Sequence, residues 1–240
     1  MTLLIILIAT LIRSTFGFGG AAIAMPLLAL NLGIQTATPL LALVETTVAF
    51  VIAMTSWKSI DFKAAGRLVI AAIAGIPMGI FLLKFAPESL VIGALGILLI
   101  LFGFYRLTGW KLPKLAHKNW AYLFGFTGGI FGGAYNVQGP LAVVYGSFAG
   151  WQPREFRATL QGYFLPTYLV IVASHALNNL WTAEIWQLYL FSLPVVFTAV
   201  WLGNNFSRRL PIERFQKLLF VAFMVLGCLL MFQGINTILP

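Results

Sequence analysis

An arginine stands one helical turn before a cluster of glycines in the segment RSTFGFGGAAIAM, which begins at residue 13. The guanidinium of Arg13 carries a fixed positive charge and can hold a planar or tetrahedral oxyanion with two hydrogen bonds. Glycine lets a ligand approach the backbone closely. This combination predicts a binding site for a small oxyanion. The candidate residues in this segment are Arg13, Ser14, Gly17, Gly19 and Gly20.

A second glycine cluster, TGGIFGGAYNVQ at residues 127–138, is followed by polar side chains. Their amide and hydroxyl groups could donate hydrogen bonds to the oxygens of an anion. The same groups could instead cap a broken backbone, and both roles stay open. The candidates here are Gly132, Gly133, Tyr135, Asn136 and Gln138, together with Gln161 at the start of the next apolar stretch.

The composition indicates where these residues must be placed. Of the 240 residues, 60% are hydrophobic and 9% are charged, and continuous apolar stretches recur along the whole chain. The net charge of +9 comes mainly from short loops, where Lys and Arg orient a membrane protein, so no nucleic-acid partner is expected. The sequence predicts an all-α polytopic membrane protein of the inner cell membrane, surrounded by lipid.

Two of the apolar stretches are too long to be ordinary spans. The stretches 2–30 and 119–149 each contain a glycine cluster near the middle. A straight helix of about 30 residues would measure about 45 Å, well beyond the hydrocarbon core. Each is therefore either a long tilted, broken helix or a re-entrant hairpin of two half-helices. Ordinary spans are expected at 36–57, 64–84, 89–107, 157–178, 183–206 and 215–237.

The charges of the loops favour the hairpin. Lys and Arg are concentrated in the loops 58–67, 106–118, 150–157 and 207–217. If all eight stretches crossed the membrane, the last of these loops would lie opposite the first two, against the positive-inside bias. If the stretch 119–149 enters and leaves on one side, all four loops are cytoplasmic. We therefore predict a re-entrant hairpin there.

The two halves of the chain resemble each other. FGGAAIAMPLL at 18–28 parallels FGGAYNVQGPLA at 131–142, and ATPLLALVE at 37–45 parallels ATLQGYFLP at 158–166. These matches predict a single transmembrane domain of two inverted repeats, each a broken or re-entrant helical hairpin followed by three transmembrane helices. Their predicted bounds are 1–110 and 118–240. Inverted repeats with broken helices near the midplane are typical of secondary transporters.

The second half-helix of each hairpin would begin at a glycine tip, near Gly20 and near Gly133. Its unpaired N–H groups and the positive end of its dipole favour an anion. An arginine inside a membrane costs several kcal/mol unless it is paired or hydrated, so Arg13 is a functional candidate. Glu45, the one carboxylate well inside a span, is either the permanent partner of Arg13 or an ion-coupling residue that carries a proton.

The segments GFGGAAIAMPLLAL, FTGGIFGGAYNVQGPLAVVYG and REFRATLQGYF resemble the TauE/SafE sulfite exporter family over almost the whole chain. The resemblance implies ion-coupled secondary transport of a sulfur-containing anion such as sulfite, thiosulfate or an organosulfonate. In this chain AYNVQ supplies bulky and polar groups where small glycines are usual in the family. The particular substrate therefore stays open.

We accordingly predict an alternating-access carrier for a small inorganic or organic sulfur anion. The alternatives are a passive anion channel and a carrier for a different small organic anion. An enzyme is not expected, because two distant histidines, one cysteine and one buried carboxylate supply neither a nucleophile with its base nor a metal cluster. No cofactor and no metal are expected.

Overall fold

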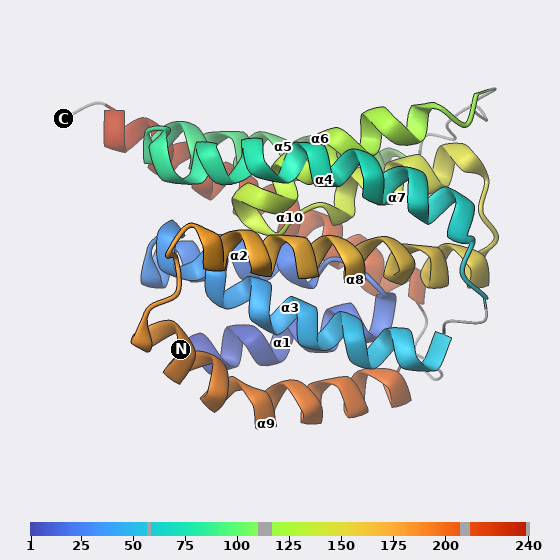
Figure 1. Ribbon diagram of the computed structural model, residues 1–240, viewed down its shortest axis with the longest axis horizontal. Helices are drawn as coiled ribbons and strands as arrows, with labels where there is room; N and C mark the ends of the chain where they lie inside the picture. The colour runs from blue at the N-terminus through green and yellow to red at the C-terminus, as the bar shows by residue number, and fades with distance from the viewer. Residues whose placement is uncertain (57–58, 110–116, 207–211, 239–240) are drawn as a thin grey trace.

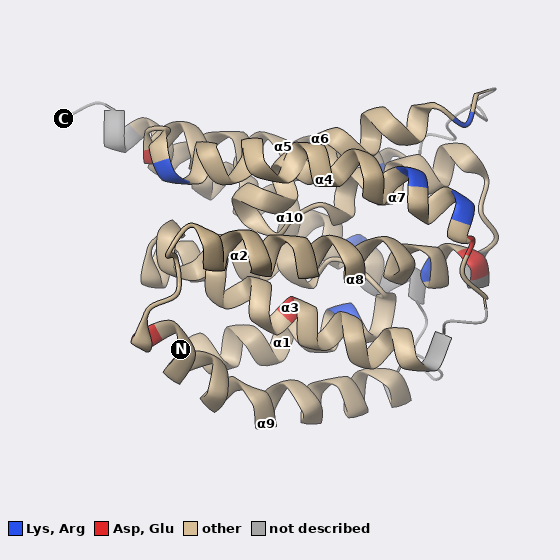
Figure 2. Ribbon diagram, in the orientation of Figure 1, with Lys and Arg blue, Asp and Glu red and all other residues tan. Residues whose placement is uncertain are grey.

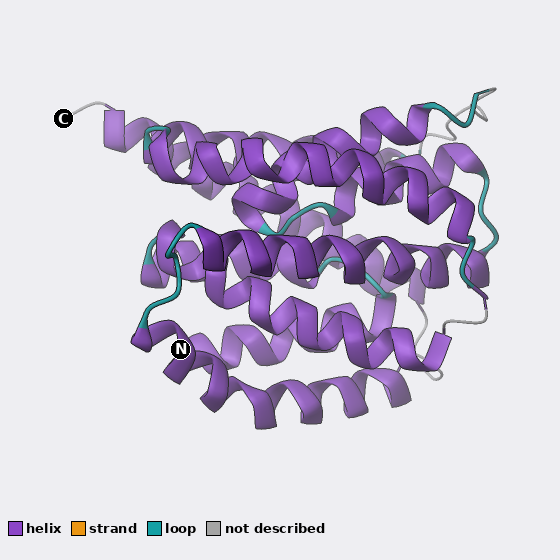
Figure 3. Ribbon diagram, in the orientation of Figure 1, coloured by secondary structure: helices purple, strands orange, loops and turns teal. Residues whose placement is uncertain are grey.

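The computed structural model describes residues 1–56, 59–109, 117–206 and 212–238, and the chain in these ranges forms ten helices without a strand (Figures 1 and 3). The helices are α1 Thr2–Phe16, α2 Gly20–Leu32, α3 Ile34–Ser56, α4 Phe62–Phe85, α5 Glu88–Thr108, α6 Trp120–Tyr135, α7 Gly139–Ala149, α8 Pro153–Leu177, α9 Ala183–Phe206 and α10 Ile212–Ile238. Six of them, α3, α4, α5, α8, α9 and α10, are long and apolar enough to cross a membrane. The prediction of an all-α polytopic membrane protein with six ordinary spans is confirmed.

The first long stretch is broken into α1 and α2 at its glycines. Gly17 and Gly19 have φ angles of 85° and 92°, a left-handed conformation that side chains with a β-carbon rarely adopt. The N–H of Gly17 donates to the carbonyl of Arg13 at 2.6 Å and so caps α1. Asn31 Nδ2 donates to Thr2 Oγ1 at 3.0 Å, so the end of α2 lies beside the start of α1. The two half-helices therefore form a hairpin.

The second long stretch forms a hairpin in the same way. The break follows α6 at Asn136, whose φ of 59° is the left-handed conformation that asparagine tolerates best after glycine. The rings of Phe124 on α6 and Phe148 on α7 have centroids 5.9 Å apart, so the start of α6 lies beside the end of α7. Residues 119–149 thus form the hairpin that their length predicted, and its entry and exit on one side of the membrane stay a prediction.

The two hairpins open at opposite ends of the helix bundle. Asp61 N–H donates to Thr159 Oγ1 at 3.0 Å, which places the start of α4 beside the start of α8. Lys84 Nζ lies 3.3 Å from Asn178 Oδ1, where both helices end. Most of the described Lys and Arg residues lie at the end of the bundle where α4, α6 and α8 begin (Figure 2). We call this the basic end, and the positive-inside bias predicts that it faces the cytoplasm.

Each hairpin packs against a helix from the other half of the chain: α1 packs on α9, and α6 packs on α4. The contact between α4 and α6 is backbone to backbone. A β-carbon at Gly129 would lie 2.3 Å from the carbonyl oxygen of Ala72, and one at Gly79 would lie 2.1 Å from that of Ile130. Small residues allow such close approach in membranes. Because each hairpin packs on a helix of the other half, the arrangement fits the predicted inverted repeats. The bounds of the repeats stay a prediction.

The close contact between α4 and α6 makes Gly129 sensitive to substitution. We expect Gly129→Ala to lower the free energy of unfolding by about 1–3 kcal/mol, because the added methyl group must push two backbones apart. Gly93→Ala on α5 is the matched control, since a β-carbon there meets no atom within 4 Å. The measurement is the thermal unfolding midpoint in detergent. Equal midpoints for the two variants would contradict the packing described here.

Candidate functional site

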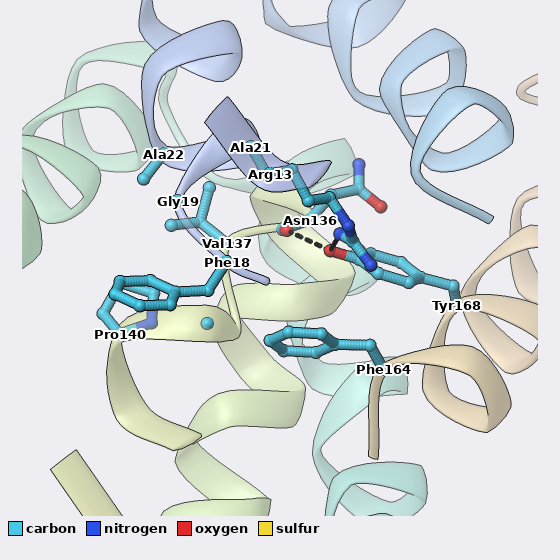
Figure 4. Close-up of a pocket in the computed structure, with 11 residues that line it drawn as sticks. Arg13, Phe18, Gly19, Ala21, Ala22, Asn136, Val137, Pro140, Phe164 and Tyr168 are labelled. Carbon is cyan, nitrogen blue, oxygen red and sulfur yellow. Dashed lines mark hydrogen bonds between the residues drawn. The ribbon is translucent and has the colours of Figure 1, made fainter. Parts of the chain in front are cut away.

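The tips of the two hairpins enclose a small cavity between α1, α2, α7 and α8 (Figure 4). Its lining residues are Arg13, Phe18, Gly19, Ala21, Ala22, Asn136, Val137, Gly139, Pro140, Phe164 and Tyr168. The cavity has a volume of about 10 Å³, roughly the space that one water molecule needs. An oxyanion with four heavy atoms would therefore have to widen it.

Both half-helices that begin at the tips start at this cavity. Gly19, Ala21 and Ala22 line it at the start of α2, and Gly139 and Pro140 line it at the start of α7. The first N–H groups of a helix have no acceptor within that helix, and the positive end of its dipole lies there. Small side chains leave these groups accessible. Two helix starts around one cavity make a favourable environment for an anion.

The guanidinium of Arg13 is buried at the cavity, with only 2% of the residue exposed. Its Nη1 forms an ion pair with Glu45 Oε2 and donates to the hydroxyl of Tyr168 at 3.0 Å. Its carbon lies 5.0 Å from the ring centroid of Phe164 and 5.1 Å from that of Tyr168, within the range of cation–π attraction. Arg13 is thus fixed on one side by a carboxylate, a hydroxyl and two aromatic faces.

The other edge of the same guanidinium is unused. Nε and Nη2 of Arg13 are buried and have no hydrogen-bond partner within the described part of the chain. These two nitrogens carry the parallel N–H groups with which arginine binds an oxyanion at two points. Glu45 therefore satisfies only part of the donor capacity of Arg13. Arg13 thus pairs with Glu45 and still has two donors without a partner, and its contact with a substrate stays a prediction.

Tyr168 links the charged pair to the second hairpin. Its hydroxyl lies 3.4 Å from Glu45 Oε2 and 3.3 Å from the carbonyl oxygen of Asn136, and it accepts a hydrogen bond from Arg13. The hydroxyl has one proton, so it donates to one of these two oxygens at a time. One side chain on α8 thereby connects α1, α3 and the tip after α6.

Of the other candidates in the first hairpin, Gly19 lines the cavity, whereas Ser14, Gly17 and Gly20 are not among its lining residues and shape the tip. The β-carbon of Ser14 packs where α9 has Gly203. Gly17 caps α1, and its carbonyl accepts a hydrogen bond from Gln161 Nε2 at 2.9 Å. A β-carbon at Gly20 would lie 2.5 Å from the carbonyl oxygen of Ala9, so glycine allows α2 to start directly against α1. Their roles in substrate binding stay predictions.

Of the candidates in the second hairpin, Asn136 lines the cavity, and the others contact neighbouring parts of the bundle. Tyr135 points to α5, where its hydroxyl donates to the carbonyl of Val91 at 2.6 Å. Gln138 Nε2 donates to Thr167 Oγ1 at 3.2 Å. The carbonyl of Gly132 accepts from the N–H of Asn136. Gly133 is in backbone contact with Ile76 on α4.

Sequence reasoning missed the aromatic residues of the site. Phe164 and Tyr168 lie three and seven positions after Gln161 and so share one face of α8 with it. A tyrosine on the buried face of a membrane helix needs a partner for its hydroxyl. That spacing from Gln161 was the available signal for Tyr168. No comparable signal marked Phe18 in the first tip.

Half-helices that meet inside a bundle of spanning helices, with a buried charged pair beside them, define a membrane transporter of the broken-helix type. The family model described as sulfite exporter TauE/SafE matches residues 2–230. The chain belongs to the TauE/SafE sulfite exporter family, as its motifs predicted. Comparison with curated proteins and with solved structures gives no match.

Family membership settles the broad class of function. The TauE/SafE proteins are exporters of sulfite, which implies a transporter of sulfite or a related sulfur anion rather than an enzyme. The six helices able to span a bilayer make the chain a multi-pass membrane protein. Its placement in the inner cell membrane stays a prediction.

The buried pair of Arg13 and Glu45 predicts a specific pattern of stability. Glu45→Leu leaves the guanidinium uncompensated and should lower the free energy of unfolding by about 3–5 kcal/mol. The double variant Arg13→Met, Glu45→Leu removes both charges and should recover most of that loss, since an apolar replacement of a buried pair is often neutral. Denaturant unfolding in detergent measures both. A double variant as unstable as the single one would contradict the pairing.

Proposed function

We propose that this chain is a secondary active transporter that moves a small sulfur oxyanion across the membrane by alternating access. The observation that carries the proposal is that Arg13 lines a cavity at two half-helix starts while its Nε and Nη2 have no partner in the described part of the chain. Two oxygens of the anion would accept from these two nitrogens, and a third would accept from N–H groups at the start of α2. Sulfite, with three oxygens on one sulfur, matches this arrangement of donors.

The apolar residues of the cavity favour a small substrate. Phe18, Val137, Pro140 and Phe164 surround the donors, and the space between them is about 10 Å³. Every added heavy atom of the anion requires a wider opening between the tips. Sulfite and thiosulfate are therefore better candidates than an organosulfonate with an extended chain.

The closed cavity supports a carrier over a channel. A channel needs a continuous hydrated path through the membrane when it conducts. In the described part of the chain, the space between the tips holds about one water molecule. A narrow space of this kind fits a carrier, whose site opens to one side at a time.

Protonation of Glu45 gives a physical mechanism for coupling the transport of the anion to protons. While Glu45 is ionised, it balances the charge of Arg13 and occupies Nη1. Protonation would remove the negative charge beside the site, so the site would attract an anion more strongly. By linkage, a bound anion would in turn favour protonation of Glu45. We therefore propose that the proton and the anion bind and leave together.

Arg13 is the residue on which binding should depend most. We expect Arg13→Ala to weaken sulfite binding on the order of 100-fold or more, as loss of a buried charged partner does. Arg13→Lys keeps the charge without the paired donors and should lose about tenfold. The readouts are ligand-dependent thermal shift and sulfite counterflow in liposomes. Lys63→Ala, an exposed cation at the basic end, is the control. Unchanged affinity in Arg13→Ala would refute this site.

Glu45→Gln separates binding from coupling. The amide keeps the size of the side chain but cannot take up a proton at the pH of the assay. We expect the variant to bind sulfite and to exchange it across the membrane, while its transport no longer responds to an imposed pH gradient. The wild-type protein serves as the reference. A variant such as Gln161→Glu is unsuitable as a control because it adds a charge. A response to the gradient equal to that of the wild type would exclude Glu45 as the coupling residue.

A further inference from the structure

At the basic end, α8 holds the tip of the first hairpin. Arg157 Nη2 donates to the carbonyl of Ser14 at 2.5 Å, and Gln161 Nε2 donates to the carbonyl of Gly17 at 2.9 Å. These carbonyls belong to the last turn of α1 and its cap, where a helix leaves acceptors unsatisfied. The stem of Arg157 also covers the tip, since a β-carbon at Gly17 would lie 2.8 Å from its Cγ.

At the opposite end, α3 holds the tip of the second hairpin in a corresponding way. Thr38 Oγ1 donates to the carbonyl of Ala134 at 3.2 Å, and Asn136 Nδ2 donates to the carbonyl of Thr38 at 2.7 Å. Thr38 is buried in the first turns of α3, as Arg157 lies in the first turns of α8. Each hairpin is thus held at its tip by a helix from the other half of the chain.

The cavity lies between these two contacts. Gly17 directly precedes Phe18 and Gly19, which line the cavity, and Ala134 precedes Asn136, which also lines it. Arg157 approaches from the basic end and Thr38 from the other end. Both contacts therefore hold backbone that flanks the cavity. Alternating access requires that one of them opens while the other stays closed.

We propose that Arg157 is the gating residue at the basic end and that Thr38 is the gating residue at the opposite end. The proposal rests on the proposed function, because only alternating access requires two gates that open in turn. A charged oxyanion is a stronger partner for a guanidinium than a neutral carbonyl is. An anion arriving at the basic end therefore draws Arg157 away from Ser14 and opens this gate.

The two gates differ in one chemical respect. Arg157 carries a positive charge, whereas Thr38 is neutral. The gate at the basic end is therefore opened by the anion itself, and the opposite gate responds to the rearrangement of the tips. This difference favours loading of the anion from the basic end.

The experiment uses a single cysteine in the cavity as a reporter. Ala22→Cys is introduced together with Cys228→Ala, which removes the native cysteine of the chain. A membrane-impermeant thiol reagent is added to membrane vesicles of either orientation, and Lys63→Cys identifies the face that carries the basic end. The variants Arg157→Ala and Thr38→Val each remove one gating contact. Lys63→Ala serves as the matched control at the basic end.

We expect Arg157→Ala to raise the labelling rate at residue 22 from the basic face by about tenfold or more, because a larger fraction of molecules is open there. Thr38→Val should raise labelling from the opposite face only. Arg157→Gln retains a donor for Ser14 and should label more slowly than Arg157→Ala. If Arg157→Ala does not fold, this milder variant must still show increased labelling from the basic face.

Labelling that is unchanged in both Arg157 variants, or raised equally from both faces, would show that Arg157 only caps α1 and would overturn the proposal. The assay needs no substrate, so its failure is separate from that of the proposed function. Gated labelling in a protein that shows no thermal shift with sulfite would leave the gates standing and refute the sulfite site. A thermal shift with sulfite but no gated labelling would support the sulfite site and overturn the gates.

Discussion

A positive charge buried inside a membrane protein must be balanced, and the structure around Arg13 is organised by that requirement. The guanidinium is almost completely buried, and Glu45, Tyr168 and the ring of Phe164 surround one side of it. These partners come from α3 and α8, while Arg13 itself ends α1. The charge therefore fixes three helices relative to one another. Nε and Nη2 of Arg13 remain without a partner in the described part of the chain, and Arg13 lines the cavity at which the two half-helices start.

The broken backbone creates a second set of unsatisfied groups, and the chain satisfies them between its halves. Carbonyls at the ends of α1 and α6 accept hydrogen bonds from α8 and α3, respectively. The glycine contact between α6 and α4 brings the second hairpin against a helix of the first half. As a result, each hairpin is attached to the other half of the chain as well as to its own half. A movement that opens the site must therefore change contacts between the halves.

Much of the fold could be predicted from the sequence, because the length of an apolar stretch and the charge of a loop act locally. Residues 119–149 were too long for one span, and the basic loops required the chain to return to the same side. The pairing of Arg13 with Glu45 was one of two alternatives, since few charges lie inside the spans. The roles of Tyr168 and Arg157 were not predicted. They depend on how α8 packs against α1, and hydrophobic periodicity does not specify which helices become neighbours.

The central claim is that an oxyanion binds the Nε–Nη2 edge of Arg13 between the two half-helix starts. The most direct measurement is a structure determined with selenite, a heavier analogue of sulfite whose selenium atom can be located by its scattering. We expect selenium between Arg13 and the first turn of α2, with the tips farther apart than in the structure described here. Selenium bound elsewhere, with the same edge of Arg13 still unoccupied, would contradict it.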